Sequence, residues 1–142
     1  MDWMFVPLRR YADFSGRSRR KEYWWFVLFQ WAVYALVVTV DQLWNDPAAE
    51  ELLLPTKVVL GAAMAFFAIP TLAVQVRRMH DRGRSGWWLL IGFAPYFGLL
   101  YLVLYMLLPG TVGPNEYGPD PRLRPGSRDP HAADRARYGG WI

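Results

Sequence analysis

Three long apolar runs limit what this chain can fold into more than any other feature. Residues 23–40, 58–76 and 87–108 are 18 to 22 residues long and contain no charged side chain. A helix rises about 1.5 Å per residue, so each run is about long enough to cross a hydrocarbon core of roughly 30 Å. We therefore predict an all-α membrane protein with three transmembrane helices at these positions.

The basic residues beside the runs predict the orientation of these helices. Segment 1–22 holds six, segment 77–86 holds four, and segment 41–57, which carries four acids, holds one. The short cytoplasmic segments of membrane proteins carry an excess of Lys and Arg. We therefore predict a multi-pass protein whose N-terminus and 77–86 segment are cytoplasmic and whose 41–57 segment lies outside.

The third run is interrupted by Gly92, Pro95 and Gly98, and this allows two interpretations. One is a single kinked helix. The other is a re-entrant hairpin turning at residues 94–98, whose arms of under ten residues would each be roughly 15 Å long. We favour the single helix, because neither arm could cross alone. Three spans then leave the tail outside. The basic residues Arg122 and Arg124 count against that, and a hairpin would remove the conflict.

The segments that flank the runs differ from them in composition. Met4, Leu8 and Tyr11 have the spacing of a short interfacial helix near the N-terminus. The C-terminal segment is rich in Gly, Pro and charge and has few aliphatic side chains, so we expect it to be extended or disordered. We divide the chain into a basic cytoplasmic segment, a transmembrane domain and a flexible tail, residues 1–22, 23–108 and 109–142.

His80 and Asp81 are the first catalytic candidates to consider. Adjacent helical side chains point about 100° apart, so the two are no ready-made dyad. The chain has no cysteine and only one other histidine, and Ser85 has no partner for nucleophilic work. We predict no catalytic residue, no cofactor and no metal site. Ser85 is expected to cap the third helix, His80 to order its loop, and Asp81 and Glu22 to pair with nearby arginines.

Two arginine-rich segments should meet on the cytoplasmic side of the membrane. Their arginines are Arg17, Arg19, Arg20, Arg77, Arg78, Arg82 and Arg84. The plainer interpretation is that these charges set the topology and pair with the neighbouring acids. The sharper one is a basic face that binds anionic lipid or a partner protein, because guanidinium groups grip phosphates bidentately and each exposed base near the surface contributes about 1 kcal/mol.

The net charge of +4 would also suit a nucleic-acid-binding protein. The charges cluster beside the apolar runs, however, which favours membrane lipids and argues against nucleic acid. An alternative function is an oligomeric small-molecule transporter or channel subunit. The runs contain no ionisable interior residue, which argues against proton coupling. A homo-oligomer or a membrane-protein partner is compatible with either function.

Three motifs resemble those of a known family. They are Phe14–Trp24 (FSGRSRRKEYW), Arg77–Trp88 (RRMHDRGRSGWW) and Gly113–Pro121 (GPNEYGPDP). The pattern is similar to that of domain of unknown function 805, the YhaH type, over roughly residues 1–121. Met79 stands where Leu is expected, and Glu116 where a basic residue is common. The resemblance implies an integral protein of the bacterial inner membrane and supplies no activity.

Overall fold

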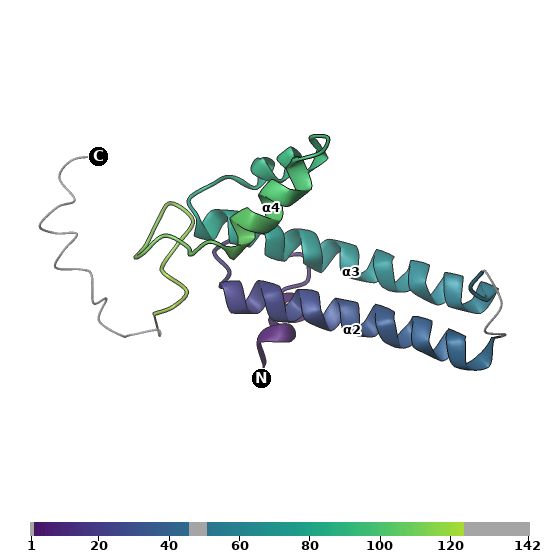
Figure 1. Cartoon of the computed structure of the whole chain (residues 1–142). Helices are drawn as coiled ribbons and strands as arrows, with labels where there is room; N and C mark the ends of the chain where they lie inside the picture. The colour runs from purple at the N-terminus through teal and green to yellow at the C-terminus, as the bar shows by residue number, and fades with distance from the viewer. Residues whose placement is uncertain (1, 46–50, 124–142) are drawn as a thin grey trace, which may run out of the picture. The chain divides into compact units, whose positions relative to one another are not determined.

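The computed structural model describes residues 2–45 and 51–123 (Figure 1). Its elements are helical, and the described residues contain no strand. In chain order they are η1 Asp2–Met4, α1 Val6–Arg9, α2 Arg20–Trp44, α3 Leu54–Asp81, η2 Gly86–Phe93 and α4 Gly98–Leu107. The all-α prediction is confirmed for this part of the chain, and the first two apolar runs lie within α2 and α3.

The chain divides into two compact units. Unit 1 comprises Met1–Asp13 and Lys21–Ala73, and unit 2 comprises Phe14–Arg20 and Val74–Ile142. Most of α2 and the first part of α3 therefore belong to unit 1. The last two turns of α3 belong to unit 2, together with η2 and α4.

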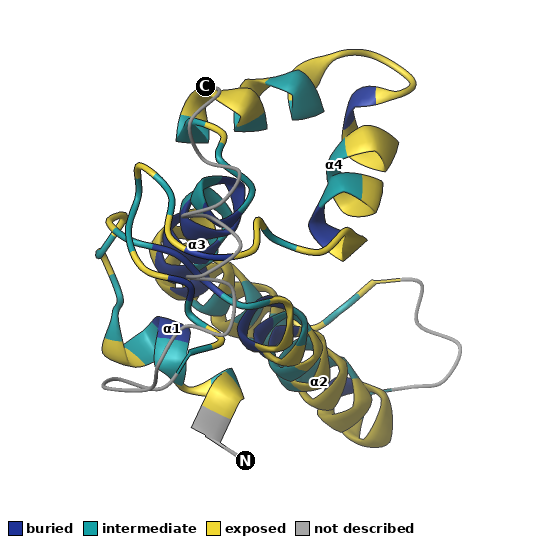
Figure 2. Ribbon diagram, turned by 90° about the vertical axis from the view of Figure 1, so that its left-hand side faces the viewer, coloured by how far each residue is buried: buried dark blue, intermediate teal, exposed yellow. Residues whose placement is uncertain are grey.

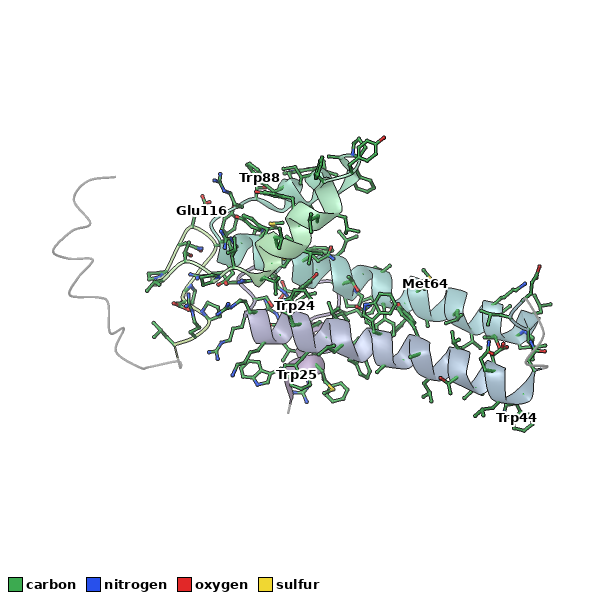
Figure 3. The ribbon with its side chains drawn as sticks, in the orientation of Figure 1. Trp24, Trp25, Trp44, Met64, Trp88 and Glu116 are labelled. Atoms are coloured by element: carbon green, nitrogen blue, oxygen red, sulfur yellow. The ribbon has the colours of Figure 1, made fainter. Side chains whose placement is uncertain are left out.

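In unit 1, helices α2 and α3 run antiparallel. Phe67 of α3 makes edge-to-face contacts with Phe26, Phe29 and Tyr34 of α2, with ring centroids 5.9 to 6.0 Å apart. Both helices are long and apolar enough to cross a membrane, and only 17% and 22% of their most apolar stretches are buried. The core helix of a soluble protein would hide far more of its apolar surface. Trp25 and Trp44 point away from α2 near its two ends (Figure 3).

Pro70 lies inside α3 without ending it. Proline has no N–H, so the carbonyl four residues earlier, that of Phe66, loses its helical donor. The hydroxyl of Tyr11 donates to this carbonyl at 2.7 Å. One residue after the proline, the Thr71 hydroxyl accepts a 2.8 Å hydrogen bond from the Gln30 amide. Side chains from other segments of unit 1 thus supply polar contacts at the proline.

In unit 2, the third apolar run is broken into two short helices. η2 and α4 are separated by a turn in which Tyr96 has a φ of +69°. At Gly98 a Cβ would lie 2.1 Å from the carbonyl oxygen of Ile91, so only glycine allows the two arms to approach this closely. The prediction of one continuous helix over 87–108 is wrong, and the chain has the hairpin of the second interpretation. Each arm is about 15 Å long, too short to span.

The hairpin arms keep most of their apolar surface outside the unit. Leu90 and Phe93 of η2 are 56% and 86% exposed, and Leu99 of α4 is 70% exposed. In Figure 2 most of α4 is yellow or teal, and its buried residues, Gly98 and Met106, lie near its two ends. An apolar surface of this extent is typical of a segment that contacts lipid or another protein.

Candidate functional site

The carboxylate of Asp81, at the end of α3, is the centre of a buried group of charges. Its Oδ1 accepts a hydrogen bond from Nε of Arg17 at 3.0 Å and forms an ion pair with Nη2 of Arg17 at 2.9 Å, and its Oδ2 accepts a hydrogen bond from Nη1 of Arg78. The three side chains are at most 4% exposed. We call these residues the Asp81 cluster. Since one carboxylate faces two guanidinium groups, the cluster needs further acceptors.

Backbone carbonyls of a later segment supply the acceptors for Arg17. Its guanidinium donates to the carbonyl oxygens of Gly113 at 2.6 Å, Thr111 at 2.7 Å and Gly118 at 3.4 Å. With the hydrogen bond to Asp81, these contacts make four hydrogen bonds from the Arg17 guanidinium, beside its ion pair with the same carboxylate. The segment passes so close to the cluster that a Cβ at Gly110 would lie 1.9 Å from Asp81 Oδ2.

Three arginines, Arg20, Arg78 and Arg82, donate to carbonyl groups at or just beyond the C-terminal end of α4. The accepting carbonyls are those of Met106, Leu107, Leu108 and Pro109. The last carbonyls of a helix have no partner within it and carry a partial negative charge, which cations stabilise. The arginines of the first two motifs therefore hold the end of the hairpin.

Residues 109–123 pack against the end of α3 through specific contacts. The N–H and hydroxyl of Thr111 donate to the Asp81 carbonyl at 2.8 and 3.1 Å, and the Asn115 amide donates to the His80 carbonyl at 2.9 Å. The His80 ring stacks on Tyr117 with centroids 4.0 Å apart. The expectation of a disordered tail is wrong for 109–123, and its remainder, 124–142, lies outside the described residues.

Asp120 closes this segment into a loop. Its Oδ2 accepts from the Gly113 N–H at 3.1 Å, and its Oδ1 accepts from the N–H and Nε of Arg122 at 2.9 and 3.1 Å. Burial by itself would raise the pKa of Asp120. The N–H groups of Arg122 and Gly113 and the Arg122 guanidinium together outweigh burial, and the pKa lies below its usual value.

The geometry gives His80 and Asp81 separate partners. His80 places Nδ1 3.1 Å from the Gly16 carbonyl oxygen, whereas the Asp81 carboxylate faces Arg17 and Arg78. Within residues 2–45 and 51–123, no three His, Cys, Asp or Glu side chains are placed to share a metal ion. The arrangement is suited to binding the backbone of residues 109–123 to the end of α3. It also leaves guanidinium groups accessible at the edge of the cluster.

Comparison with known proteins identifies the family. The model of the family described as "Protein of unknown function (DUF805)" matches residues 11–119. The chain belongs to this family. It is 37% identical to the inner membrane protein YhaH of Escherichia coli K12, over 88% of this chain and all of YhaH. It is 41% identical to the inner membrane protein YhaI of the same strain, over 87% of this chain and 98% of YhaI. No solved structure matches the chain significantly.

The stretch matched by the DUF805 model contains the Asp81 cluster and the carbonyls that surround it. The seven arginines predicted to bind lipid or a partner lie in different environments: Arg17, Arg77 and Arg78 are buried, Arg19 and Arg82 are half-buried, and Arg20 and Arg84 are exposed. Ser85 is the N-cap of η2 and accepts from the Trp87 N–H at 3.4 Å. Glu22 is buried in the first turn of α2, in unit 1.

Sequence reasoning missed the residues of the third DUF805 motif and those just before it. Gly110, Thr111, Asn115, Tyr117 and Asp120 all contact the end of α3 or order the loop that does. The motif Gly113–Pro121 was visible in the sequence, but its Gly and Pro content is also that of a disordered tail. The motif differs from a disordered tail because its backbone carbonyls accept hydrogen bonds from Arg17. A pattern of side chains does not reveal such acceptors.

Proposed function

We propose that this chain is a multi-pass protein of the bacterial inner membrane that has no catalytic role and binds anionic lipid headgroups on a basic cytoplasmic face. The names of its E. coli relatives, inner membrane proteins YhaH and YhaI, support the location. The two long apolar helices, α2 and α3, support a multi-pass arrangement. The excess of basic residues in segments 1–22 and 77–86 supports a cytoplasmic N-terminus.

The charge balance of unit 2 carries the lipid proposal. Its described residues include eight arginines against three carboxylates, those of Asp81, Glu116 and Asp120. Asp81 and Asp120 are buried and already bonded to guanidinium groups. The described part of the unit therefore keeps an excess of five positive charges, and one of its accessible arginines, Arg122, is already paired with Asp120. We call Arg19, Arg20, Arg82, Arg84 and Arg122 the arginine rim. Guanidinium groups at a membrane surface attract anionic headgroups and bind their phosphates in pairs.

The alternative of an oligomeric transporter or channel subunit remains a prediction. The polar amide of Gln30, which would mark a path through α2, donates to Thr71 of α3. This contact favours a role of Gln30 in joining the two helices. Substrate flux in liposomes containing the purified protein is the direct test of the alternative.

Lipid retention in native mass spectra tests the main proposal. The full chain is released from nanodiscs with equal parts of phosphatidylglycerol and phosphatidylcholine. We expect the wild type to retain the anionic lipid, and Arg20→Gln with Arg84→Gln to weaken this preference by about 10- to 30-fold, because each base near the surface contributes about 1 kcal/mol. The control, Lys57→Gln, removes a charge from segment 41–57, which lies on the opposite side in the proposed topology, and should keep the preference. Equal retention of the two lipids by the wild type would refute the proposal.

A further inference from the structure

Among the arginine rim, three members surround one small cavity in unit 2. Its volume is about 40 Å³, and its lining comprises the three arginines Arg19, Arg20 and Arg122 together with Arg78, Asp81, Gly110 and Pro121. A water-sized group needs about 15 Å³ in this measure, so the cavity has room for two or three such groups. That is the scale of the terminal oxygens of a single phosphate.

The electrostatics of the cavity select an anion. Four guanidinium groups line it. The one carboxylate of the lining, that of Asp81, is shared between Arg17 and Arg78, and Arg122 is also paired with Asp120, which is not part of the lining. The positive charges repel one another, and this repulsion contributes to the cost of holding Arg20 near Arg78. An anion among them would remove the repulsion and gain charge-assisted hydrogen bonds.

The arginines are already fixed in place by the backbone. Arg19 donates to the Pro121 carbonyl, Arg20 donates through Nη1 to Leu107, and Arg122 donates through Nη2 to Gly110 at 2.9 Å. Among the described residues, the contacts of Arg20 use only Nη1, and those of Arg122 use only Nε and Nη2. Donors therefore remain for a ligand, on side chains whose positions are set beforehand. Prior ordering of this kind lowers the entropy cost of binding.

We infer that this cavity is a phosphate-binding site, formed where the arginines of the first motif meet the loop of the third. Its ligand is a phosphate group, borne either by a lipid headgroup or by a soluble phosphate. The inference deepens the proposed function, because it names the group that a specific part of the arginine rim recognises. It also predicts selectivity: a monoester phosphate, with an exposed dianionic end, fits the cavity better than a diester that is blocked on both sides.

The test measures binding of two probes to the full chain in phosphatidylcholine nanodiscs: dioctanoyl phosphatidic acid and inorganic phosphate. The pocket variant is Arg20→Gln with Arg122→Gln. The matched variant is Arg82→Gln with Arg84→Gln, which removes the same charge from unit 2 outside the cavity. We expect the matched variant to weaken phosphatidic acid binding by about 10- to 30-fold, the effect of losing two surface bases, and the pocket variant by at least about tenfold more than the matched variant. Circular dichroism checks that both variants are folded.

A third variant separates shape from charge. Arg20→Lys with Arg122→Lys keeps the charge and loses the guanidinium forks, so it should weaken phosphatidic acid binding and leave the general preference for phosphatidylglycerol intact. Competition by inorganic phosphate that the pocket variant abolishes would assign a soluble ligand, and binding of the lipid alone would assign the headgroup. Either result supports the site.

The outcomes separate the two proposals. If phosphatidic acid binding is weakened equally in the pocket and matched variants, the cavity is not a phosphate site, and a diffuse attraction to anionic lipid remains. A wild type without any preference for anionic lipid, but with phosphate binding that requires Arg20 and Arg122, would overturn the lipid proposal and keep the cavity. Binding that no variant alters would overturn the cavity.

Discussion

Asp81 shows how far one side chain can organise a group of charges. Each of its carboxylate oxygens accepts from a buried guanidinium, and its backbone carbonyl accepts from Thr111. Buried ion pairs are costly to form, because both partners lose water, yet they are still more costly to break from one side. The effect of losing Asp81 is therefore set by what happens to Arg17 and Arg78 when they are left without a counter-charge.

We expect Asp81→Asn to lower the free energy of unfolding by about 3 to 5 kcal/mol. The amide keeps the size of the side chain and removes its charge, so the loss comes from the two uncompensated guanidinium groups. Glu116→Gln removes an exposed carboxylate of the same unit and should change stability by less than about 0.5 kcal/mol. Thermal unfolding of the purified protein, followed by tryptophan fluorescence, compares them. Equal transition temperatures would contradict the role given to Asp81.

Two glycines offer a matched test of the close approach at the cluster. A Cβ at Gly110 would lie 1.9 Å from Asp81 Oδ2, whereas a Cβ at Gly61, in α3, would meet nothing within 4 Å. We expect Gly110→Ala to destabilise the protein by at least about 1 to 3 kcal/mol, the usual cost of overpacking. Gly61→Ala should be neutral or stabilising by up to about 1 kcal/mol. A harmless Gly110→Ala would show that the loop is not held against Asp81.

Asp120 predicts a dependence of stability on acid pH. Its pKa lies below the usual 3.8 in the folded protein, so the folded state binds its proton less readily than the unfolded state. Its contribution to stability is then complete above about pH 4 and is lost as the pH falls through the folded pKa. Between pH 6 and pH 2.5, the free energy of unfolding should fall less for Asp120→Asn than for the wild type. If stability falls equally with pH in the two proteins, Asp120 does not make this contribution.

At the scale of elements, a side chain far away in sequence repairs the break that Pro70 makes in α3. The hydroxyl of Tyr11 donates to the Phe66 carbonyl, which the proline leaves without its helical donor. Nothing in the sequence indicates that Tyr11 is this donor. A tyrosine 55 residues earlier follows no periodic pattern.

A double-mutant cycle tests this repair. Tyr11→Phe alone should cost about 1 kcal/mol, because the Phe66 carbonyl loses its donor. In a Pro70→Ala background the new backbone N–H bonds the same carbonyl, and the cost of Tyr11→Phe should fall to a few tenths of a kcal/mol. Denaturant unfolding of the four proteins gives the coupling energy. Additive effects would mean that the tyrosine acts elsewhere.

The hairpin of η2 and α4 could not be predicted from the sequence alone. Gly92, Pro95 and Gly98 were recognised as interruptions, but run length favoured one helix. The deciding contact is between Gly98 and the Ile91 carbonyl, which depends on the three-dimensional approach of two arms. The arginines also stabilise the hairpin. They donate to the carbonyls at the end of α4, so this short helix can end beside the Asp81 cluster.

At the scale of the whole molecule, the number of spans decides where the C-terminus lies. The sequence correctly predicted an all-helical chain, because hydropathy and charge follow directly from residue type. Of the three transmembrane helices that it predicted, two correspond to the long apolar helices α2 and α3. It did not predict the order of 109–123, since the partners there are backbone carbonyls. We propose two spanning helices and a hairpin, an arrangement that would return the chain to its starting side and remove the conflict with the basic residue Arg122.

Reporter fusions at residue 142 test this topology. With two spans, we expect a C-terminal green fluorescent protein to fluoresce and a C-terminal alkaline phosphatase to be inactive, as both report a cytoplasmic end. Three spans would give the opposite pair. A fusion after residue 45, between α2 and α3, should show phosphatase activity and serves as the control for an external position.

The distances in sequence between the partners of Arg17 have a consequence for biogenesis. Asp81 follows it by 64 residues, and the accepting carbonyls follow by 94 to 101 residues. During translation Arg17 is therefore made long before any of these partners, and its set of acceptors is complete only when the third motif has left the ribosome. Docking of the last segment is the event that seals this charge from water. A nascent chain halted before Gly118 lacks the last of these acceptors.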